Sequence, residues 1–170
     1  RCVINKILWR NIVPPQFQIR KKLVRIYKNI LLKKDKVKLL KFVKTIVKDF
    51  GPGFPGLQTD PDLHTYKEIM PLLKTIKKYL KGYTIQKCWA NFSEGNYMGW
   101  HTHPECDIGM VYYLKNKSDI GTVFKKQGLE VDVKKCPENS LLIFNSKLVH
   151  SIPYHLKKER YSITFNLIKI

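Results

Sequence analysis

Three histidines have a spacing that suits a shared metal ion. His101-Thr102-His103 places two imidazoles two residues apart, and side chains two apart on a strand lie on the same face of a sheet. Both rings could then reach one cation at about 2.0–2.1 Å. His150 lies 47 residues after His103, beyond the buried-strand pattern Leu141-Leu142-Ile143-Phe144. A shared metal site and separate structural histidines both fit this spacing.

The last segment of the chain is polar on one side and apolar on the other. Arg160, Ser162, Thr164 and Asn166 alternate with Tyr161, Ile163, Phe165 and Leu167. This alternation predicts a strand. Its polar face could lie in water, or it could line the interior of a barrel while helices cover the apolar face. In the second arrangement Arg160 needs an anion, such as a ligand carboxylate that the guanidinium binds with two hydrogen bonds.

A series of short strands is expected to position these residues. After Gly82 the hydrophobic period is two, and turn residues such as Ser93-Glu94-Gly95-Asn96 separate the apolar segments. The predicted strands are 84–92, 97–102, 107–115, 121–125, 128–133, 139–144 and 160–169. Short strands at this spacing favour an antiparallel sandwich or barrel.

Helical periodicity dominates the first half of the chain. Residues 16–50 predict one helix, which Gly51-Pro52-Gly53 would end, and residues 62–81 predict a second, kinked or broken at Pro71. Helices followed by strands indicate an α+β, mainly β protein with the helices packed on one sheet. We expect a single domain over 1–170, mainly helical over 1–82, with the core that carries the metal site over 83–170.

The chain of 170 residues is strongly basic, with 32 Lys and Arg against 13 Asp and Glu, a formal charge of +19. Lys outnumbers Arg 27 to 5, which favours a solvated lysine-rich surface over a dedicated phosphate-binding face. The charge nevertheless suits an acidic or nucleic-acid partner. Neither a membrane span nor a signal peptide is recognisable, and the four cysteines are scattered, so a cytoplasmic location and reduced thiols are expected.

Several motifs together resemble the iron- and 2-oxoglutarate-dependent oxygenases. In chain order they are Trp89-Ala90-Asn91, Gly95, His101-Thr102-His103-Pro104, Val111-Tyr112-Tyr113-Leu114, Leu142-Ile143-Phe144, Leu148-Val149-His150 and the segment Glu159 to Asn166. The resemblance covers roughly residues 55–170. It is closest to the uncharacterised 2OG-Fe(II) oxygenase family of marine bacteria and phages that carries His-x-His-Pro.

This resemblance implies a fold, two cofactors and a ligand set. The fold would be a double-stranded β-helix, or jelly-roll. His101 would be the first iron(II) ligand and His150 the distal one. Arg160 would bind the far carboxylate of 2-oxoglutarate with Ser162 beside it, and Asn91 and Tyr113 would be further cosubstrate contacts. The implied activity is a dioxygenase that hydroxylates an unidentified substrate and releases succinate and CO2.

The chain departs from the family pattern at one position. Most members carry His-x-Asp or His-x-Glu, whereas this chain has His103 where the carboxylate is expected. His103 could complete a three-histidine site, Asp107 could supply the carboxylate instead, or the site could be inactive. We favour His103.

Two other classes of protein remain as alternatives. Gly95, His101, His103 and Asp107 imitate the cupin motif, so an inactive jelly-roll or a cupin-like metal-binding protein is one. However, a whole strand separates Pro137 from His150, which is unlike a cupin. A basic nucleic-acid-binding or nucleic-acid-demethylating protein is the other.

Overall fold

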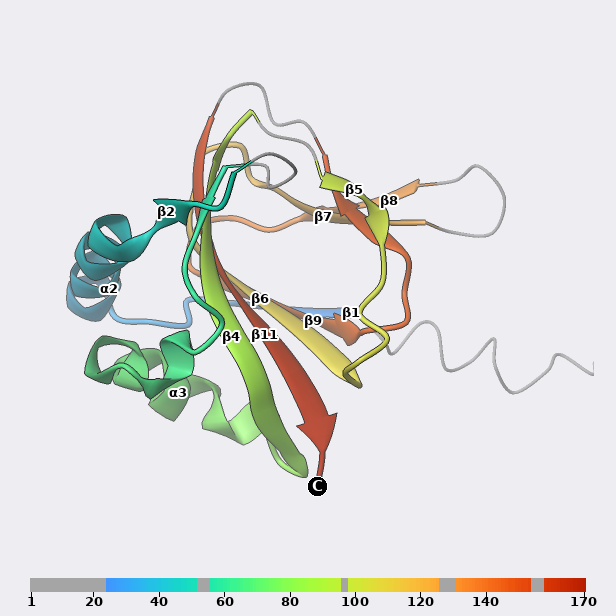
Figure 1. Cartoon of the computed structure of the whole chain (residues 1–170), viewed down its shortest axis with the longest axis horizontal. Coiled ribbons are helices and arrows are strands. Elements are labelled where there is room, and N and C mark those ends of the chain that lie inside the picture. The colour runs from blue at the N-terminus through green and yellow to red at the C-terminus, as the bar shows by residue number, and fades with distance from the viewer. Residues whose placement is uncertain (1–23, 52–55, 96–97, 126–130, 154–157) are drawn as a thin grey trace, which may run out of the picture.

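Two antiparallel sheets that face each other form the body of the protein (Figure 1). The computed structural model describes residues 24–51, 56–95, 98–125, 131–153 and 158–170. Its strands are β1 (Val24–Lys28), β2 (Lys48–Asp49), β3 (Leu57–Gln58), β4 (Tyr83–Glu94), β5 (Met98–His101), β6 (Ile108–Asn116), β7 (Ile120–Lys125), β8 (Val131–Lys135), β9 (Ser140–Asn145), β10 (His150–Ile152) and β11 (Glu159–Lys169). The major sheet has the order β1-β9-β6-β11-β4-β3-β2, and the minor sheet has the order β5-β10-β7-β8.

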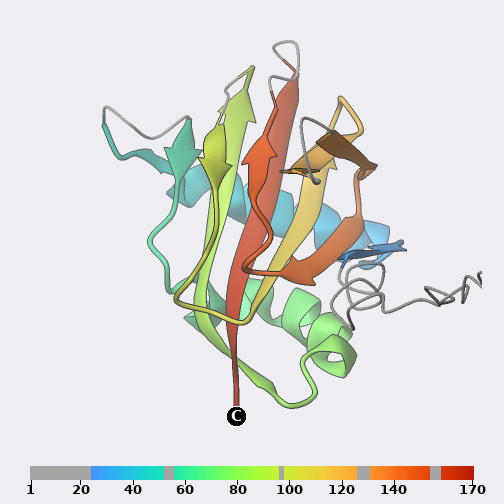
Figure 2. The ribbon, with the colours of Figure 1, turned by 90° about the vertical axis from the view of Figure 1, so that its right-hand side faces the viewer.

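Helices cover the outer face of the major sheet, opposite the minor sheet (Figures 1 and 2). The α-helices are α2 (Lys33–Ile46) and α3 (Met70–Ile76), and the 3-10 turns are η1 (Leu63–Thr65), η2 (Lys67–Ile69) and η3 (Lys77–Tyr79). Buried side chains of the helices and of β11 form one hydrophobic cluster, which includes Leu39, Val43, Leu72, Ile76, Tyr161, Ile163, Phe165 and Leu167. The predicted packing of helices on the apolar face of the last strand is therefore confirmed.

The other face of β11 is turned toward the minor sheet. Arg160, Ser162 and Asn166 are buried there although they are polar. A second, smaller hydrophobic cluster, called here the interior cluster, lies on this side of the major sheet and consists of Val111, Tyr113, Phe124, Cys136, Leu142 and Phe144. The polar face of the last strand thus lies in the protein interior and not in water.

The N-terminal part differs from its prediction. The expected helix over 16–50 is shorter, because Val24–Lys28 forms β1 and pairs with β9 at the edge of the major sheet. This segment alternates apolar and polar residues, and its β-branched Val24 and Ile26 suit a strand. The helix also ends before Gly51, since Val47 is extended and β2 follows it. Residues 16–23 and Pro52-Gly53 lie outside the described part of the chain.

The second predicted helix is broken into short turns. Pro71 lies at the start of α3, where its missing N–H costs no hydrogen bond, so it begins a helix instead of kinking one. The predicted strands correspond to β4 through β9 and β11. Residues 97 and 128–130 of these predicted strands lie outside the described part of the chain. Strand β10 was not predicted, because its three residues are too few to show a period. Among the described helices, none is long and apolar enough to span a membrane.

Candidate metal and cosubstrate site

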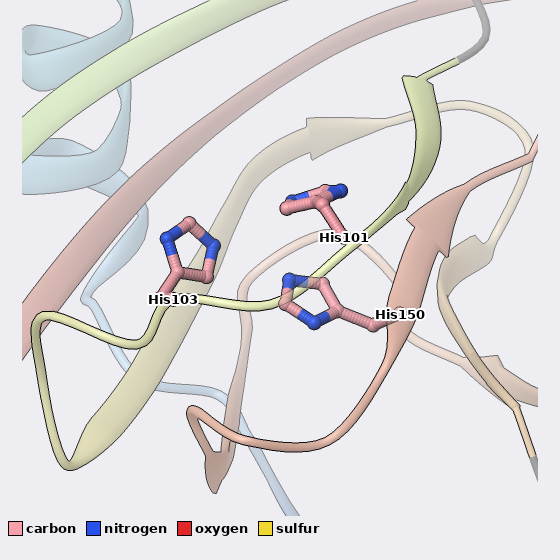
Figure 3. Close-up of side chains that lie close together, drawn as sticks. All are labelled: His101, His103 and His150. Atoms are coloured by element: carbon pink, nitrogen blue, oxygen red, sulfur yellow. The ribbon is translucent and has the colours of Figure 1, made fainter.

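Two of the three histidines come from neighbouring strands of the minor sheet, and the third comes from the loop that follows one of these strands. His101 ends β5 and His150 begins β10, and the two residues are directly paired between these antiparallel strands. His103 lies beyond the strand, in a loop that its backbone N–H fixes by donating to Ser146 O over 3.0 Å. The expected strand geometry for His101 and His103 is therefore wrong, yet the loop still turns the His103 ring toward the other two (Figure 3).

The three rings form a compact cluster. One nitrogen from each of His101, His103 and His150 lies within 4.8 Å of the other two. The ring centroids are 4.3 Å apart for His101 and His150, 5.1 Å for His103 and His150, and 5.2 Å for His101 and His103. Nitrogens that are each about 2 Å from a shared ion lie at most about 4 Å from one another, so the three rings need only a small adjustment to hold a metal together.

Hydrogen bonds decide which ring nitrogens are available. His101 Nδ1 lies 2.8 Å from Gly99 O, and His150 Nδ1 lies 2.7 Å from Leu148 O. A carbonyl accepts only from a protonated nitrogen, so each Nδ1 carries the hydrogen and each Nε2 is left with its lone pair. The rings are thus held in the tautomer that suits a metal ligand.

Burial favours the uncharged form of His103 and His150. His150 is 4% exposed, and desolvation lowers its pKa to about 4. Desolvation, followed by the repulsion of His101, also lowers the pKa of His103. Neutral imidazole is the form that coordinates a metal, so the environment favours the ligand state at neutral pH.

Arg160 is a buried cation without enough partners. It is 2% exposed, and its Nε and Nη1 have no hydrogen-bond partner among the described residues. Its guanidinium carbon lies 5.8 Å from the centre of the Tyr113 ring, and burial lowers its pKa. A buried guanidinium with free donors is costly, and a carboxylate with two oxygens would satisfy it.

The residues around Arg160 are themselves well ordered by hydrogen bonds. Ser162 is buried on the same face of β11 and is paired with Asn91 on β4 and Tyr113 on β6. The Tyr113 hydroxyl lies 2.9 Å from Thr122 Oγ1 and accepts from Thr122 N over 2.8 Å, and burial raises the pKa of this hydroxyl. The Tyr113 side chain is therefore neutral and held in one position by its hydrogen bonds, and its ring lies beside the guanidinium.

Asn91 has a different setting from Arg160 and Ser162. Its Oδ1 accepts from Trp89 Nε1 over 3.1 Å, and its Nδ2 donates to Thr164 Oγ1 over 3.1 Å. Both ends of the amide are therefore engaged within the protein. A direct contact of Asn91 with the cosubstrate stays a prediction.

Asp107, the alternative third ligand, points elsewhere. Its Oδ2 accepts from the backbone N–H of Lys169 over 2.8 Å, and the residue is exposed. The group of possible ligands in the described chain contains His101, His103 and His150 without Asp107. The geometry therefore favours His103 as the third ligand.

Glu105 adjoins the cluster but was not singled out from the sequence, and its partner Asn166 was named only as part of the polar face of the last strand. Glu105 Oε1 lies 3.7 Å from His103 Nδ1, and Asn166 Nδ2 donates to the same oxygen over 3.1 Å. The spacing of Glu105, two residues after His103, was the available signal. It was not informative without the loop conformation, because an exposed Glu in a turn is ordinary.

Comparison with solved structures relates the fold of this chain to those of known proteins, although no family profile and no curated protein matches the sequence. A prolyl hydroxylase from Trichoplax adhaerens, solved with a hypoxia inducible factor fragment, has a TM-score of 0.69 at 17% identity and covers 90% of this chain and 86% of its own. HygX from Streptomyces hygroscopicus, solved with nickel, 2-oxoglutarate and hygromycin B, has a TM-score of 0.70 at 11% identity, covering 91% and 86%. This chain has the double-stranded β-helix fold of the 2-oxoglutarate oxygenases.

A third similar structure extends the range of sources. The viral collagen prolyl hydroxylase of Paramecium Bursaria Chlorella virus-1 has a TM-score of 0.65 at 14% identity, covering 89% of this chain and 92% of its own. The similarity spans nearly the whole of each protein. At the level of the fold, it confirms the resemblance that the motifs predicted, and with it the predicted jelly-roll with helices on one sheet.

Proposed function

We propose that this protein is an Fe(II)- and 2-oxoglutarate-dependent dioxygenase that hydroxylates an unidentified substrate. The observation that carries the proposal is the pairing of the histidine cluster with a buried, incompletely bonded arginine. Both border the interior cluster: the His150 ring lies 4.8 Å from the Phe144 ring, and Arg160 lies over Tyr113. A metal and an anionic cosubstrate could therefore be bound side by side between the sheets.

The side chains of the candidate site are suitable ligands for iron(II) and for 2-oxoglutarate. His101, His103 and His150 would hold iron(II) through Nε2, and imidazole is a suitable ligand for iron. Arg160 would bind the far carboxylate of 2-oxoglutarate, which supplies the anion that its buried Nε and Nη1 lack. When bound, iron(II) and 2-oxoglutarate activate dioxygen, so that one oxygen atom enters a substrate C–H bond and the other leaves in succinate, with release of CO2.

The protein itself contributes position and a dry environment. The hydrogen bonds of His101 and His150 to backbone carbonyls fix two ligand rings before the metal arrives. Phe124 and Phe144 pack against His150 and exclude water from that side of the cluster. The Tyr113 ring would orient the Arg160 guanidinium, and the guanidinium would then orient the bound cosubstrate through its far carboxylate.

An anaerobic titration with iron(II) and 2-oxoglutarate tests this function without knowledge of the substrate. We expect a visible metal-to-ligand charge-transfer band that needs both components, and succinate release when oxygen is admitted. Absence of the band at saturating concentrations would contradict the proposal. It would favour the alternative of an inactive jelly-roll.

The positive surface supports a second, separable role in binding acidic partners. Exposed lysines follow one another along α2, among them Lys33, Lys34, Lys38 and Lys41. A nucleic acid held by such lysines would dissociate steeply with added salt, and its affinity would not need His101 or His150. Equal binding of DNA by the wild type and a His150→Ala variant, with strong salt dependence, would support this role.

A further inference from the structure

The three histidines are not held in the same way. The Nδ1 atoms of His101 and His150 lie against neutral backbone carbonyls, whereas His103 Nδ1 lies 3.7 Å from the carboxylate of Glu105. His103 also stands where the resemblance to the 2-oxoglutarate oxygenases places a coordinating carboxylate. We propose that Glu105 is a positioning residue of the metal site, which acts through His103 and restores a negative charge one imidazole further from the metal.

Glu105 is held in place independently of His103. The side-chain amide of Asn166, which is 1% exposed on β11, donates to Glu105 Oε1 over 3.1 Å. The same oxygen faces His103 Nδ1. A buried amide on a central strand is a rigid support, so it holds one oxygen of the exposed Glu105 carboxylate on the side of His103 that faces away from the cluster.

The backbone around His103 explains why a carboxylate is needed there. The His103 N–H donates to Ser146 O, and the His103 carbonyl accepts from Cys106 N over 3.3 Å. The loop thus fixes the main chain of His103 but provides no carbonyl for its ring, unlike Gly99 O for His101 and Leu148 O for His150. A ring without a partner at Nδ1 could adopt either tautomer, and only one of them offers Nε2 to the metal.

Charge gives the second reason. Iron(II) with a 2-oxoglutarate dianion and three neutral imidazoles has no net charge, whereas two imidazoles and a carboxylate leave one negative charge. Glu105 supplies that charge 3.7 Å behind His103 Nδ1, at an ion-pair distance and not at a hydrogen-bond distance. A negative charge behind a ligating histidine makes the histidine a better donor. Lys87, paired with Asn166 across β4 and β11, lowers the pKa of His103 and so opposes this effect at the ring, whereas it also lowers the pKa of Glu105 and so favours the carboxylate.

This inference rests on the proposed function, and binding of Co(II) to the metal-free protein tests it without turnover. Glu105→Gln keeps an oxygen for Asn166 and removes only the charge. We expect Co(II) to bind this variant about 10- to 100-fold more weakly, measured by calorimetry and by the visible Co(II) bands. Glu138→Gln is the matched control, because Glu138 pairs with Lys36 on α2 and its loss should leave the affinity unchanged.

The same Glu105→Gln substitution in a His103→Asp protein tests whether Glu105 acts through His103 or only maintains the loop. His103→Asp brings a carboxylate to the ligand position, where Glu105 would repel it. In the His103→Asp protein, Glu105→Gln should leave the Co(II) affinity unchanged or increase it, whereas in the wild type the same substitution should weaken the affinity. Equal weakening in both backgrounds would overturn the proposal, because it would show that Glu105 only maintains the loop.

The possible failures are distinguishable. If the wild type binds Co(II) and Glu105→Gln binds it equally well, the role of Glu105 is overturned and the proposed function stands. If the wild type binds no Co(II), the proposed function and the role of Glu105 fall together.

Discussion

Replacement of Arg160 by Met gives the sharpest test of the cosubstrate site. The methionine fills a similar volume but removes both buried donors that lack a partner, Nε and Nη1. Two charge-assisted hydrogen bonds contribute about 1.5–3 kcal/mol each, so their loss should cost about 3–6 kcal/mol of binding free energy. This corresponds to a 2-oxoglutarate affinity weaker by roughly 10²- to 10⁴-fold.

Thermal unfolding with Mn(II) as a substitute for iron(II) would measure this effect. At a concentration 100 times its Kd, 2-oxoglutarate should stabilise the wild type by about 2.7 kcal/mol. For a domain of this size that is a rise in Tm of roughly 5–11 °C. Arg160→Met should show almost no rise, while its Tm without ligand should equal or exceed that of the wild type, because a costly buried cation has been removed.

Arg25→Met provides the control. Arg25 is exposed on β1, so this substitution removes the same charge at a site away from the interior. The control should respond to 2-oxoglutarate like the wild type. An unchanged ligand response in Arg160→Met would refute the anchoring role, and a large loss of stability without ligand would mean that Arg160 is a structural residue.

Three other predictions concern the cluster and its support. His150→Ala should abolish iron(II) binding while circular dichroism stays native, and unchanged iron stoichiometry would contradict the ligand assignment. Burial lowers the pKa of His150 to about 4. In the unfolded chain a histidine has a pKa of about 6.5, so the unfolded state binds a proton at a higher pH than the folded state does. The free energy of unfolding of the metal-free protein should therefore fall by up to about 3 kcal/mol as the pH drops from about 6.5 to 4. In His150→Gln, urea unfolding should show a weaker pH dependence, and an identical slope would refute this cause. A Cβ at Gly121 would lie 2.4 Å from Cys136 Sγ and 3.0 Å from the Tyr113 hydroxyl, so Gly121→Ala should destabilise the protein. The cost should be about 1–3 kcal/mol, and adding Cys136→Ala should recover part of it in urea unfolding; no recovery would show that the clash lies elsewhere.

The fold could be predicted where periodicity is strong and long. Residues 160–167 of β11 alternate without a break, so both the strand and its two faces were predictable. Strand β1 was misread as part of a helix because lysines and apolar residues around it also fit a helical period, and its pairing with β9 depends on a contact far along the chain. Local sequence does not encode such long-range pairing.

The site was predictable in its residues and less so in its geometry. Residue type and spacing were enough to select His101, His103 and His150, which the structure brings together. The reason given for His103 was wrong, because the strand ends at His101 and a loop fixed by Ser146 positions the ring. That Asp107 points away and Glu105 lies beside His103 depends on the conformation of this loop, which residue spacing does not specify.

Part of what stabilises the fold lies before the residues that would do the chemistry. Every proposed ligand follows Tyr83, yet β1 pairs with β9 through five residues, and Val24 and Ile26 pack on the interior cluster. A fragment that starts at Tyr83 would uncover the edge of β9 and the apolar face that α2 shields. Bare edges and apolar faces promote aggregation. Truncation studies that aim at a minimal enzyme should therefore retain the chain from Val24 onward, however dispensable that segment looks from its distance to the histidines.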